Sequence, residues 1–170
     1  MTTAASTDDR HRRHRAVVAY GANLGDRRAT VLAAVADLAA AEGVEVSAVS
    51  DAIETVALRP QGEDPSAPAY LNGIVLLRTR LGADDLLALL HRIEADHGRV
   101  RAERWGDRTL DLDLVDYDGE QRDDPALTLP HPRAAERVFV LRPWLQVEPD
   151  AVLPGRGRVA DLLAGLEVPR

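Results

Sequence analysis

The chain has 170 residues and a net charge of −7 at pH 7, with 45% hydrophobic and 29% charged residues, as expected of one globular domain. It contains no cysteine and no lysine, which excludes disulfides, cysteine-ligated metals, a P-loop lysine and Schiff-base chemistry. The negative charge and the lack of an apolar run of ~18 residues predict a cytoplasmic protein with no nucleic-acid partner and no membrane span.

The N-terminal part is predicted to be a tail followed by a strand and a turn. Residues 1–15 are polar and basic, which is typical of a disordered tail, and residues 16–170 are predicted to form one domain. Ala16–Tyr20 is short and apolar, as in a buried strand. Gly21–Asp26 is a predicted turn, in which Asp26 is placed to cap the next helix.

A helix, a strand and a long loop are expected next. Residues 31–38 carry apolar side chains at helical spacing, and Gly43 is expected to close that helix. Val44–Ala57 holds several β-branched residues and is predicted to be a strand. Leu58–Ala69 contains three prolines and a glycine, which predicts a long loop of the kind that often carries function.

The third predicted strand and second predicted helix follow. Tyr70–Arg80 is the strand, with Tyr70 and Asn72 on the same face and Gly73 as a candidate β-bulge. Asp84–His97 carries a helical apolar stripe, and Gly98 is expected to end it.

Thr109–Tyr117 is the fourth predicted strand, and short C-terminal helices are expected over residues 141–147 and 159–166. The resulting order, βαββαβ, predicts an α+β, ferredoxin-like fold: an antiparallel sheet with both main helices on one face.

The segment Gly98–Tyr117 holds the strongest candidate for a functional site. Asp111 and Asp113 alternate with three leucines, so the two carboxylates share one strand face, about 6.6 Å apart along the strand. The leucines are expected to face the helices, which leaves the carboxylates on the open face with Tyr70 and Asn72. Paired carboxylates suit Mg²⁺, and the arginines before them suit polyphosphate, while a set of merely solvated charges is the alternative.

These residues resemble the 6-hydroxymethyl-7,8-dihydropterin pyrophosphokinases of folate biosynthesis, over about Ala16 to Asp150. Each motif is short, but their order and spacing are specific. The matching pieces are Gly21–Asp26, Tyr70–Asn72, Gly98–Arg101, Arg104–Gly106, Arg108–Asp113, Leu129–Pro132 and Arg137–Leu141.

Enzymes of this family transfer the pyrophosphoryl group of ATP to the hydroxymethyl oxygen of a reduced pterin and release AMP. The resemblance implies that Asp111 and Asp113 bind two Mg²⁺ ions and that Arg99 and Arg108 are catalytic residues on the phosphates. Asp113 is also the candidate for the catalytic base. The resemblance further implies a monomer whose partners are its small-molecule substrates, with ATP as co-substrate.

The resemblance also assigns the residues of two substrate sites. Tyr70 and Phe139 are expected to stack on the pterin, and Asn72 is expected to supply its amide partner. The full pterin set is Thr55, Leu58, Tyr70, Asn72, Trp105, Arg137 and Phe139. The full ATP set is His91, Glu94, Arg99, Arg101, Arg104, Arg108, Thr128 and His131.

Two segments depart from the family pattern: the loop from Val56 to Ala69 is unusual and longer, and the arginine-rich loop from Arg99 to Arg108 is one residue shorter than in some members. Two other functions are the alternatives to the enzyme. A ferredoxin-like RNA-binding domain would bind RNA without Mg²⁺, and a regulatory domain would bind a small molecule without turning over ATP.

Overall fold

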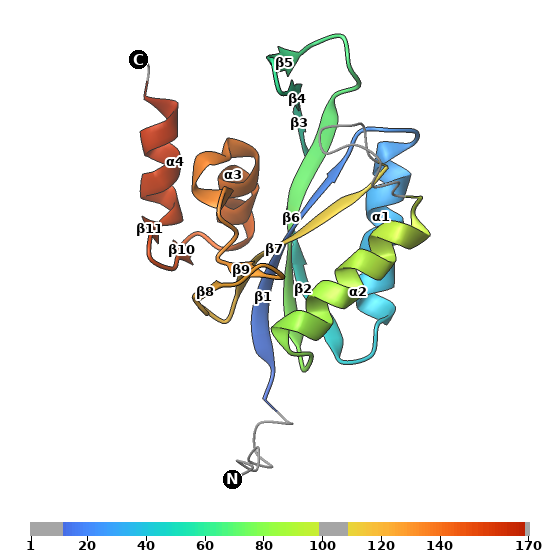
Figure 1. Cartoon of the computed structure of the whole chain (residues 1–170), viewed down its shortest axis with the longest axis vertical. Coiled ribbons are helices and arrows are strands. Elements are labelled where there is room, and N and C mark those ends of the chain that lie inside the picture. Colours follow the sequence, from blue (N-terminus) through green and yellow to red (C-terminus); the bar gives the residue numbers. More distant parts are fainter. Residues whose placement is uncertain (1–11, 99–108, 169–170) are drawn as a thin grey trace.

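The computed structural model describes residues 12–98 and 109–168, and an antiparallel sheet lies at its centre (Figure 1). The sheet order is β2-β6-β1-β7, and β3 pairs with the start of β6 on the same edge as β2. The strands are β1 (His14–Ala22), β2 (Val44–Val49), β3 (Ile53–Thr55), β6 (Tyr70–Thr79) and β7 (Asp111–Tyr117).

Helix α1 (Arg27–Ala40) follows β1, and α2 (Ala83–Asp96) follows β6. Both lie on one face of the sheet, so the predicted ferredoxin-like fold is confirmed (Figure 1). The predicted cap is also present: the Asp26 carboxylate accepts a hydrogen bond of 3.0 Å from the backbone N–H of Ala29. Gly43 is not the end of α1, because the helix stops three residues earlier and Gly43 (φ +77°) turns the chain into β2.

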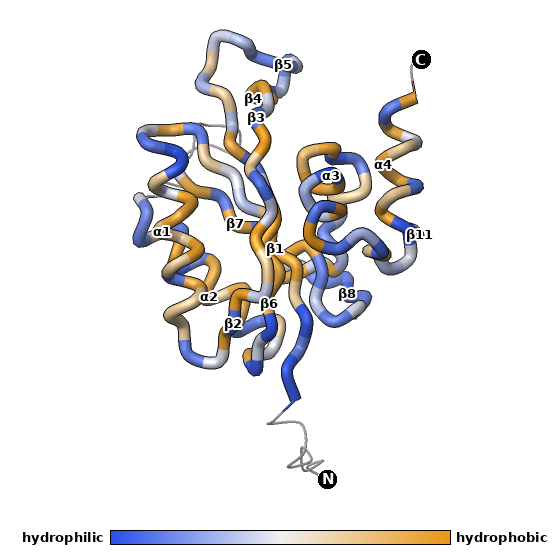
Figure 2. Tube along the Cα trace, turned by 180° about the vertical axis from the view of Figure 1, so that it is seen from behind, coloured by the Kyte–Doolittle hydropathy of each residue, from blue (hydrophilic) through white to orange (hydrophobic). Residues whose placement is uncertain are grey.

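The face of the sheet that α1 and α2 cover is closed and apolar, and we call it the helix face. Leu86 and Leu90 of α2 and Leu38 of α1 are all fully buried against it. Figure 2 shows hydrophobic segments gathered where the central strands run against these helices. The strand residues in this core include Val18, Tyr20, Leu71, Val75, Leu77, Leu110, Leu112 and Leu114.

Gly73 also belongs to this face, and the predicted bulge at Gly73 is wrong. β6 pairs with β1 without a register shift through Gly73, which lies opposite Tyr20. A Cβ at position 73 would lie 2.1 Å from the Tyr20 hydroxyl oxygen, because the tyrosine ring crosses over the glycine. The glycine is therefore required by packing of the helix face, not by a strand irregularity.

The opposite face, expected to be open, is half covered by a second layer. This layer consists of η1 (Ala134–Glu136), α3 (Val138–Val147) and α4 (Val159–Glu167), with α3 beginning three residues before the predicted Leu141. Its core packs Trp144, which is fully buried, against strand residues such as Val17 and Ile74. The remaining half of this face stays accessible, and it contains the site described below.

The predicted strand Val44–Ala57 and the predicted loop Leu58–Ala69 both differ from the structure. The strand is divided into β2 and β3 at Ser50, whose hydroxyl accepts a hydrogen bond of 2.8 Å from the backbone N–H of Ile74. The loop contains a small hairpin of β4 (Ala57–Arg59) and β5 (Gly62–Asp64), which extends beyond the end of the sheet (Figure 1). Two further hairpins are β8 (Arg122–Asp123) with β9 (Thr128–Leu129) and β10 (Val152–Leu153) with β11 (Gly157–Arg158).

β1 begins at His14, so the predicted boundary of a disordered tail at residue 15 is wrong for its last residues. Arg15 donates hydrogen bonds to Asp116 at 2.9 Å and to Glu148, and Trp144 donates to Glu148 at 2.7 Å. Burial raises the pKa of Asp116, and the Arg15 guanidinium opposes that rise. These contacts join β1, β7 and α3, although Arg15 belongs to a segment whose composition is typical of a solvated tail. Among the described residues, no helix combines the length and apolarity that crossing a bilayer requires.

Candidate active site

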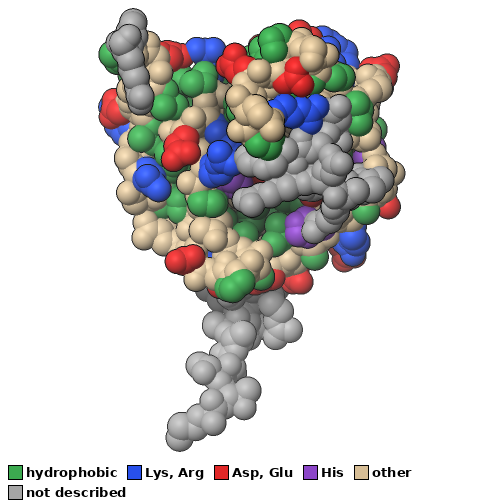
Figure 3. Space-filling model, turned by 45° about the horizontal axis from the view of Figure 1, so that its top comes forward, with side chains coloured by type: hydrophobic (Ala, Val, Ile, Leu, Met, Phe, Trp, Pro, Cys, Tyr) green, Lys and Arg blue, Asp and Glu red, His purple; other side chains and the backbone are tan. Residues whose placement is uncertain are grey.

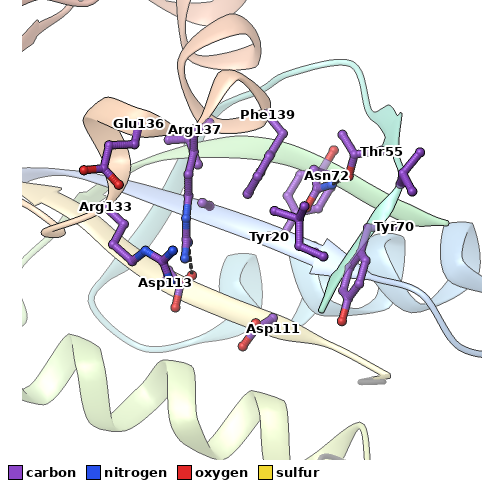
Figure 4. A pocket seen from close by; sticks show the side chains of 15 residues that line it. Tyr20, Thr55, Tyr70, Asn72, Asp111, Asp113, Arg133, Glu136, Arg137 and Phe139 are labelled. Atoms are coloured by element: carbon purple, nitrogen blue, oxygen red, sulfur yellow. Dashed lines mark hydrogen bonds and ion pairs between the residues drawn. The ribbon is translucent and has the colours of Figure 1, made fainter. Parts of the chain in front are cut away.

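A pocket of about 400 Å³ lies where the accessible half of the sheet meets the start of α3 (Figure 4). β1, β3, β6 and β7 supply its floor and sides, and residues from η1 to Val140 supply its roof. We call it the first pocket. It gathers every residue of the predicted pterin set that the structure describes: Thr55, Leu58, Tyr70, Asn72, Arg137 and Phe139.

Asp111 and Asp113 line the first pocket from β7. They lie opposite Gly21 and Ala19 of β1, while the alternating Leu110, Leu112 and Leu114 are buried in the helix-face core. The predicted division of this strand between two faces is thus confirmed. Burial of the leucines fixes the register, because a slip of one residue would put the carboxylates into the apolar core.

Asn72 is held in a fixed orientation at the inner end of the first pocket. It is only 6% exposed, and its side-chain amide donates a hydrogen bond of 2.6 Å to the hydroxyl of Thr55. Gly21 lies beside it on β1: a Cβ there would come within 2.9 Å of the Asn72 amide oxygen. Gly21 thus leaves space for the amide, a role that the sequence did not reveal, because the glycine reads as part of a turn.

Arg137 and Phe139 close the first pocket from the start of α3. The Arg137 guanidinium lies 5.6 Å from the centre of the Phe139 ring and 3.7 Å from the Asp113 carboxylate. Burial lowers the pKa of Arg137, and Asp113 opposes that effect. Tyr70 enters from the opposite side (Figure 4), so two aromatic rings stand on either side of the space above Asp111.

A second pocket, of about 320 Å³, lies outside the free edge of β7, between that strand and α2. It contains the described members of the predicted ATP set, His91, Glu94, Thr128 and His131. Glu94 is only 1% exposed, so its carboxylate belongs to the floor of this pocket and not to the helix surface. Asp113 lines both pockets, which makes it the residue at their junction.

His131 is a neutral hydrogen-bond donor in this setting. Burial, followed by the charges of Arg137 and Arg133, lowers its pKa to about 4. Its Nδ1 accepts a hydrogen bond of 3.2 Å from the backbone N–H of Arg133, so the ring proton is on Nε2. The Nε2–H group is then available to an acceptor in the second pocket.

The remaining predicted site residues, Arg99, Arg101, Arg104, Trp105 and Arg108, lie outside the described residues. Figure 3 shows one face of the molecule, on which some arginine and histidine side chains lie close together. Within residues 12–98 and 109–168, no three His, Cys, Asp or Glu side chains are grouped so as to hold a metal ion. Among the described residues, Asp111 and Asp113 therefore form a pair of carboxylates with which no third carboxylate or imidazole is grouped as a metal ligand.

The structure also adds residues that the sequence analysis did not select. Arg133 and Glu136 line the first pocket from the turn before α3. Arg133 and Arg137 flank the single 3₁₀ turn of η1, and both line the first pocket. No local sequence pattern marks Arg133, because its place in the pocket depends on how this turn packs against β7.

The fold and the two joined pockets define a ferredoxin-like domain with a bipartite site for small molecules. The model of the family described as 7,8-dihydro-6-hydroxymethylpterin-pyrophosphokinase (HPPK) matches residues 17–149, and this chain belongs to that family.

Individual relatives agree with this assignment. The chain is 40% identical over 158 residues to the 2-amino-4-hydroxy-6-hydroxymethyldihydropteridine pyrophosphokinase of Synechocystis sp., covering 93% of this chain and 78% of the relative. It is 40% identical over 153 residues to the enzyme of the same name in Methylorubrum extorquens, covering 90% and 94%.

Solved structures resemble this chain in fold. A crystal structure of a single-substitution variant of Plasmodium falciparum HPPK-DHPS with pteroate superposes with a TM-score of 0.68 over 91% of this chain, at 12% identity. This chain spans 43% of that solved chain, and at such low identity the likeness concerns the fold alone.

Proposed function

We propose that this protein transfers the pyrophosphoryl group of ATP to 6-hydroxymethyl-7,8-dihydropterin in folate biosynthesis and releases AMP. The hydroxymethyl oxygen forms a bond to the β-phosphorus, and the bond from that phosphorus to the oxygen bridging to the α-phosphorus breaks. AMP leaves with that bridging oxygen, and the hydroxyl proton is released. The observation that carries the proposal is the junction at Asp113, which lines a pocket with the pterin residues and a pocket with the ATP residues.

The first pocket would bind the pterin. A pterin is flat and has an edge of amide-like donors and acceptors, so it requires stacking surfaces and a fixed polar partner. Tyr70 and Phe139 would supply the two rings, and the Asn72 amide, fixed by Thr55, would pair with the pterin edge. Leu58 would cover the pocket from the β4–β5 hairpin, where its side chain is half exposed. Trp105, outside the described residues, is proposed to complete this set.

The second pocket would bind the nucleotide. Thr128 and the Nε2–H of His131 would donate hydrogen bonds to it, and Glu94 and His91 would contact it from α2. The nucleotide would then lie outside β7, with its phosphates directed across Asp113 toward the first pocket. Pocket lining by these four residues supports this orientation.

Asp111 and Asp113 fit Mg²⁺ that arrives with ATP better than a resident metal ion. Mg²⁺ in nucleotide sites is typically held by one or two carboxylates, with water and substrate phosphates as the remaining ligands. A carboxylate pair without a third grouped ligand in the described part of the chain is that kind of donor set. Two bound Mg²⁺ ions would neutralise the triphosphate and hold it for displacement.

The arginines would neutralise the remaining negative charge of the phosphates. Arg99, Arg101, Arg104 and Arg108 lie outside the described residues, and we propose that they contact the triphosphate, with Arg99 and Arg108 as the catalytic pair. Guanidinium groups bind phosphate oxygens through paired hydrogen bonds, and this chain has no lysine to replace them.

Asp113 is the proposed acceptor of the hydroxyl proton, since it lies beside the first pocket. We further propose that residues 16–170 act as one monomeric domain in the cytoplasm.

The test is incubation of the purified protein with ATP, Mg²⁺ and the reduced pterin, followed by separation of the nucleotides. AMP should form in proportion to the pterin diphosphate, and chelation of Mg²⁺ should stop the reaction. Formation of ADP, or no turnover in the presence of all three, would contradict the proposal. An RNA-binding function is disfavoured, because α3 covers part of the sheet face on which such domains stack bases.

A further inference from the structure

Arg133 is a second cation of the first pocket, beside Arg137. Its backbone is held in place on both sides: His131 donates a backbone hydrogen bond of 2.8 Å to Val115 of β7, and Arg137 donates one of 3.2 Å to Ala134. Ala134 is 1% exposed and packs in the core beneath α3. The turn is therefore fixed against β7, and the direction in which Arg133 leaves it is determined by the fold.

That direction leads to the junction of the two pockets. Figure 4 shows the Arg133 side chain reaching toward Asp113, beside Arg137. Arg133 lines the first pocket, whereas His131, only two residues earlier, lines the second. A group that passes from one pocket to the other would pass between these side chains.

Among the described residues, both cations and acids line the first pocket: Arg133 and Arg137, with Asp111, Asp113 and Glu136. Arg133 and Arg137 are close enough for the charge of Arg133 to disfavour the charge of Arg137, and both disfavour protonation of His131. Asp113 pairs with Arg137 at 3.7 Å. Two guanidinium groups that converge in this way are stabilised by an anion with several oxygens between them, since each can bind two oxygens at once.

We propose that Arg133 contacts the transferred diphosphoryl group of ATP at the entrance to the first pocket and helps to position it for attack. This inference rests on the proposed function, because that function supplies the anion. The interaction would be strongest when the group lies between nucleotide and pterin. It should therefore affect the turnover number more than the binding of either substrate alone.

The experiment compares Arg133→Ala, Arg133→Lys and Arg28→Ala with the wild-type protein in the AMP-forming assay. Arg28 is an exposed arginine on α1, behind the opposite face of the sheet, and serves as the matched control. Arg133→Ala should lower kcat about 30- to 100-fold and change KM for the pterin less than about threefold. Arg133→Lys should recover about tenfold, because it restores the charge without the paired donors. Arg28→Ala should match the wild type.

Three results would overturn the inference. Wild-type kcat in Arg133→Ala would show that the side chain does not contact the transferred group. A large rise in KM for the pterin with unchanged kcat would assign Arg133 to ground-state binding instead. Absence of AMP from the wild-type protein would contradict the proposed function and this inference together, so the two failures are distinguishable.

Discussion

The two faces of the sheet have different roles, although the same strands form both of them. On the helix face, the strands and two helices form a continuous apolar core with side chains such as Leu77 and Leu90. On the opposite face, a second apolar core stops halfway, and polar side chains occupy the remaining floor beneath Phe139. Packing on the helix face fixes the positions of the strands, and side chains on the other face of the same strands form the site.

β7 shows how one segment serves both faces. Its leucines are buried on the helix face and its aspartates line the first pocket on the other. Because the strand is also the sheet edge, Asp113 is reached from a second pocket beyond that edge. We therefore expect substitutions on the helix face to reduce the stability of the protein, and substitutions on the half-covered face to reduce its activity.

The largest effect is expected for Asp113→Ala. This change removes the only described acidic side chain shared by the two pockets, and kcat should fall about 1,000-fold. The melting temperature should change by less than about 3 °C, because the side chain is half exposed and no apolar packing is lost. AMP formation and a thermal unfolding scan measure the two quantities.

Glu120→Ala, in the exposed turn after β7, is the control and should retain wild-type activity. An Asp113→Ala variant with at least a tenth of the wild-type kcat would remove Asp113 from the chemistry. That result would also contradict the assignment of stability to the helix face and of activity to the half-covered face.

Leu77→Ala tests the helix face. Leu77 of β6 is fully buried in the apolar core, so the substitution should lower the free energy of unfolding by about 2 to 5 kcal/mol. The kcat per folded molecule should remain within about twofold, because Leu77 lines neither pocket. Leu32→Ala, at an exposed leucine of α1, should cost less than about 0.5 kcal/mol. Urea unfolding measures the stabilities, and a stable but inactive Leu77→Ala would contradict the comparison.

The sequence allowed prediction of the parts of the fold that depend on local patterns. Alternation along β7 predicted which side of the strand Asp111 and Asp113 would occupy, and Asp26 predicted the start of α1. Such features follow from residues close together in the chain. The placement of α3 over half of the sheet depends on contacts between distant segments, such as Arg15 with Glu148, and no local pattern encodes it.

The candidate site shows the same division. Residues in short motifs, such as Tyr70 with Asn72, could be assigned from the sequence, and the structure brings them into one pocket. Gly21 and Arg133 could not, because their roles depend on what lies opposite them across the fold. A glycine required by an approaching amide and a glycine in a turn have the same appearance in a sequence.

Gly21→Ala and Gly73→Ala test the two faces separately, because Gly21 and Gly73 are strand glycines on opposite faces. A Cβ at position 21 would press on the Asn72 amide oxygen, so KM for the pterin should rise about tenfold while the protein stays folded. Gly165→Ala in α4, where a Cβ meets no atom within 4 Å, should leave KM unchanged. Steady-state kinetics with varied pterin provide the measurement.

Gly73→Ala should give the reverse result. The added methyl would overlap the Tyr20 ring in the helix-face core, which should cost about 1 to 3 kcal/mol of stability. If Gly21→Ala lost stability without a change in KM, the half-covered face would have to be regarded as a second structural core.

The smallest effect is expected from His131, at the edge where the two pockets adjoin. Its pKa is about 4 in the folded protein, below the ordinary value of 6.5, so the unfolded chain takes up the proton first as the pH falls. The stability that comes from keeping this ring neutral is therefore complete above about pH 6.5 and is lost as the pH falls toward 4. The free energy of unfolding of the wild-type protein should fall between pH 7 and pH 4.5. In His131→Asn this fall should be smaller, by on the order of 1 kcal/mol.

NMR titration of the imidazole, assigned with the same variant, should give a midpoint well below 6.5 and the proton on Nε2. A midpoint near 6.5 would mean that the ring is charged in mildly acidic solution and lies in water, not at the wall of a nucleotide pocket.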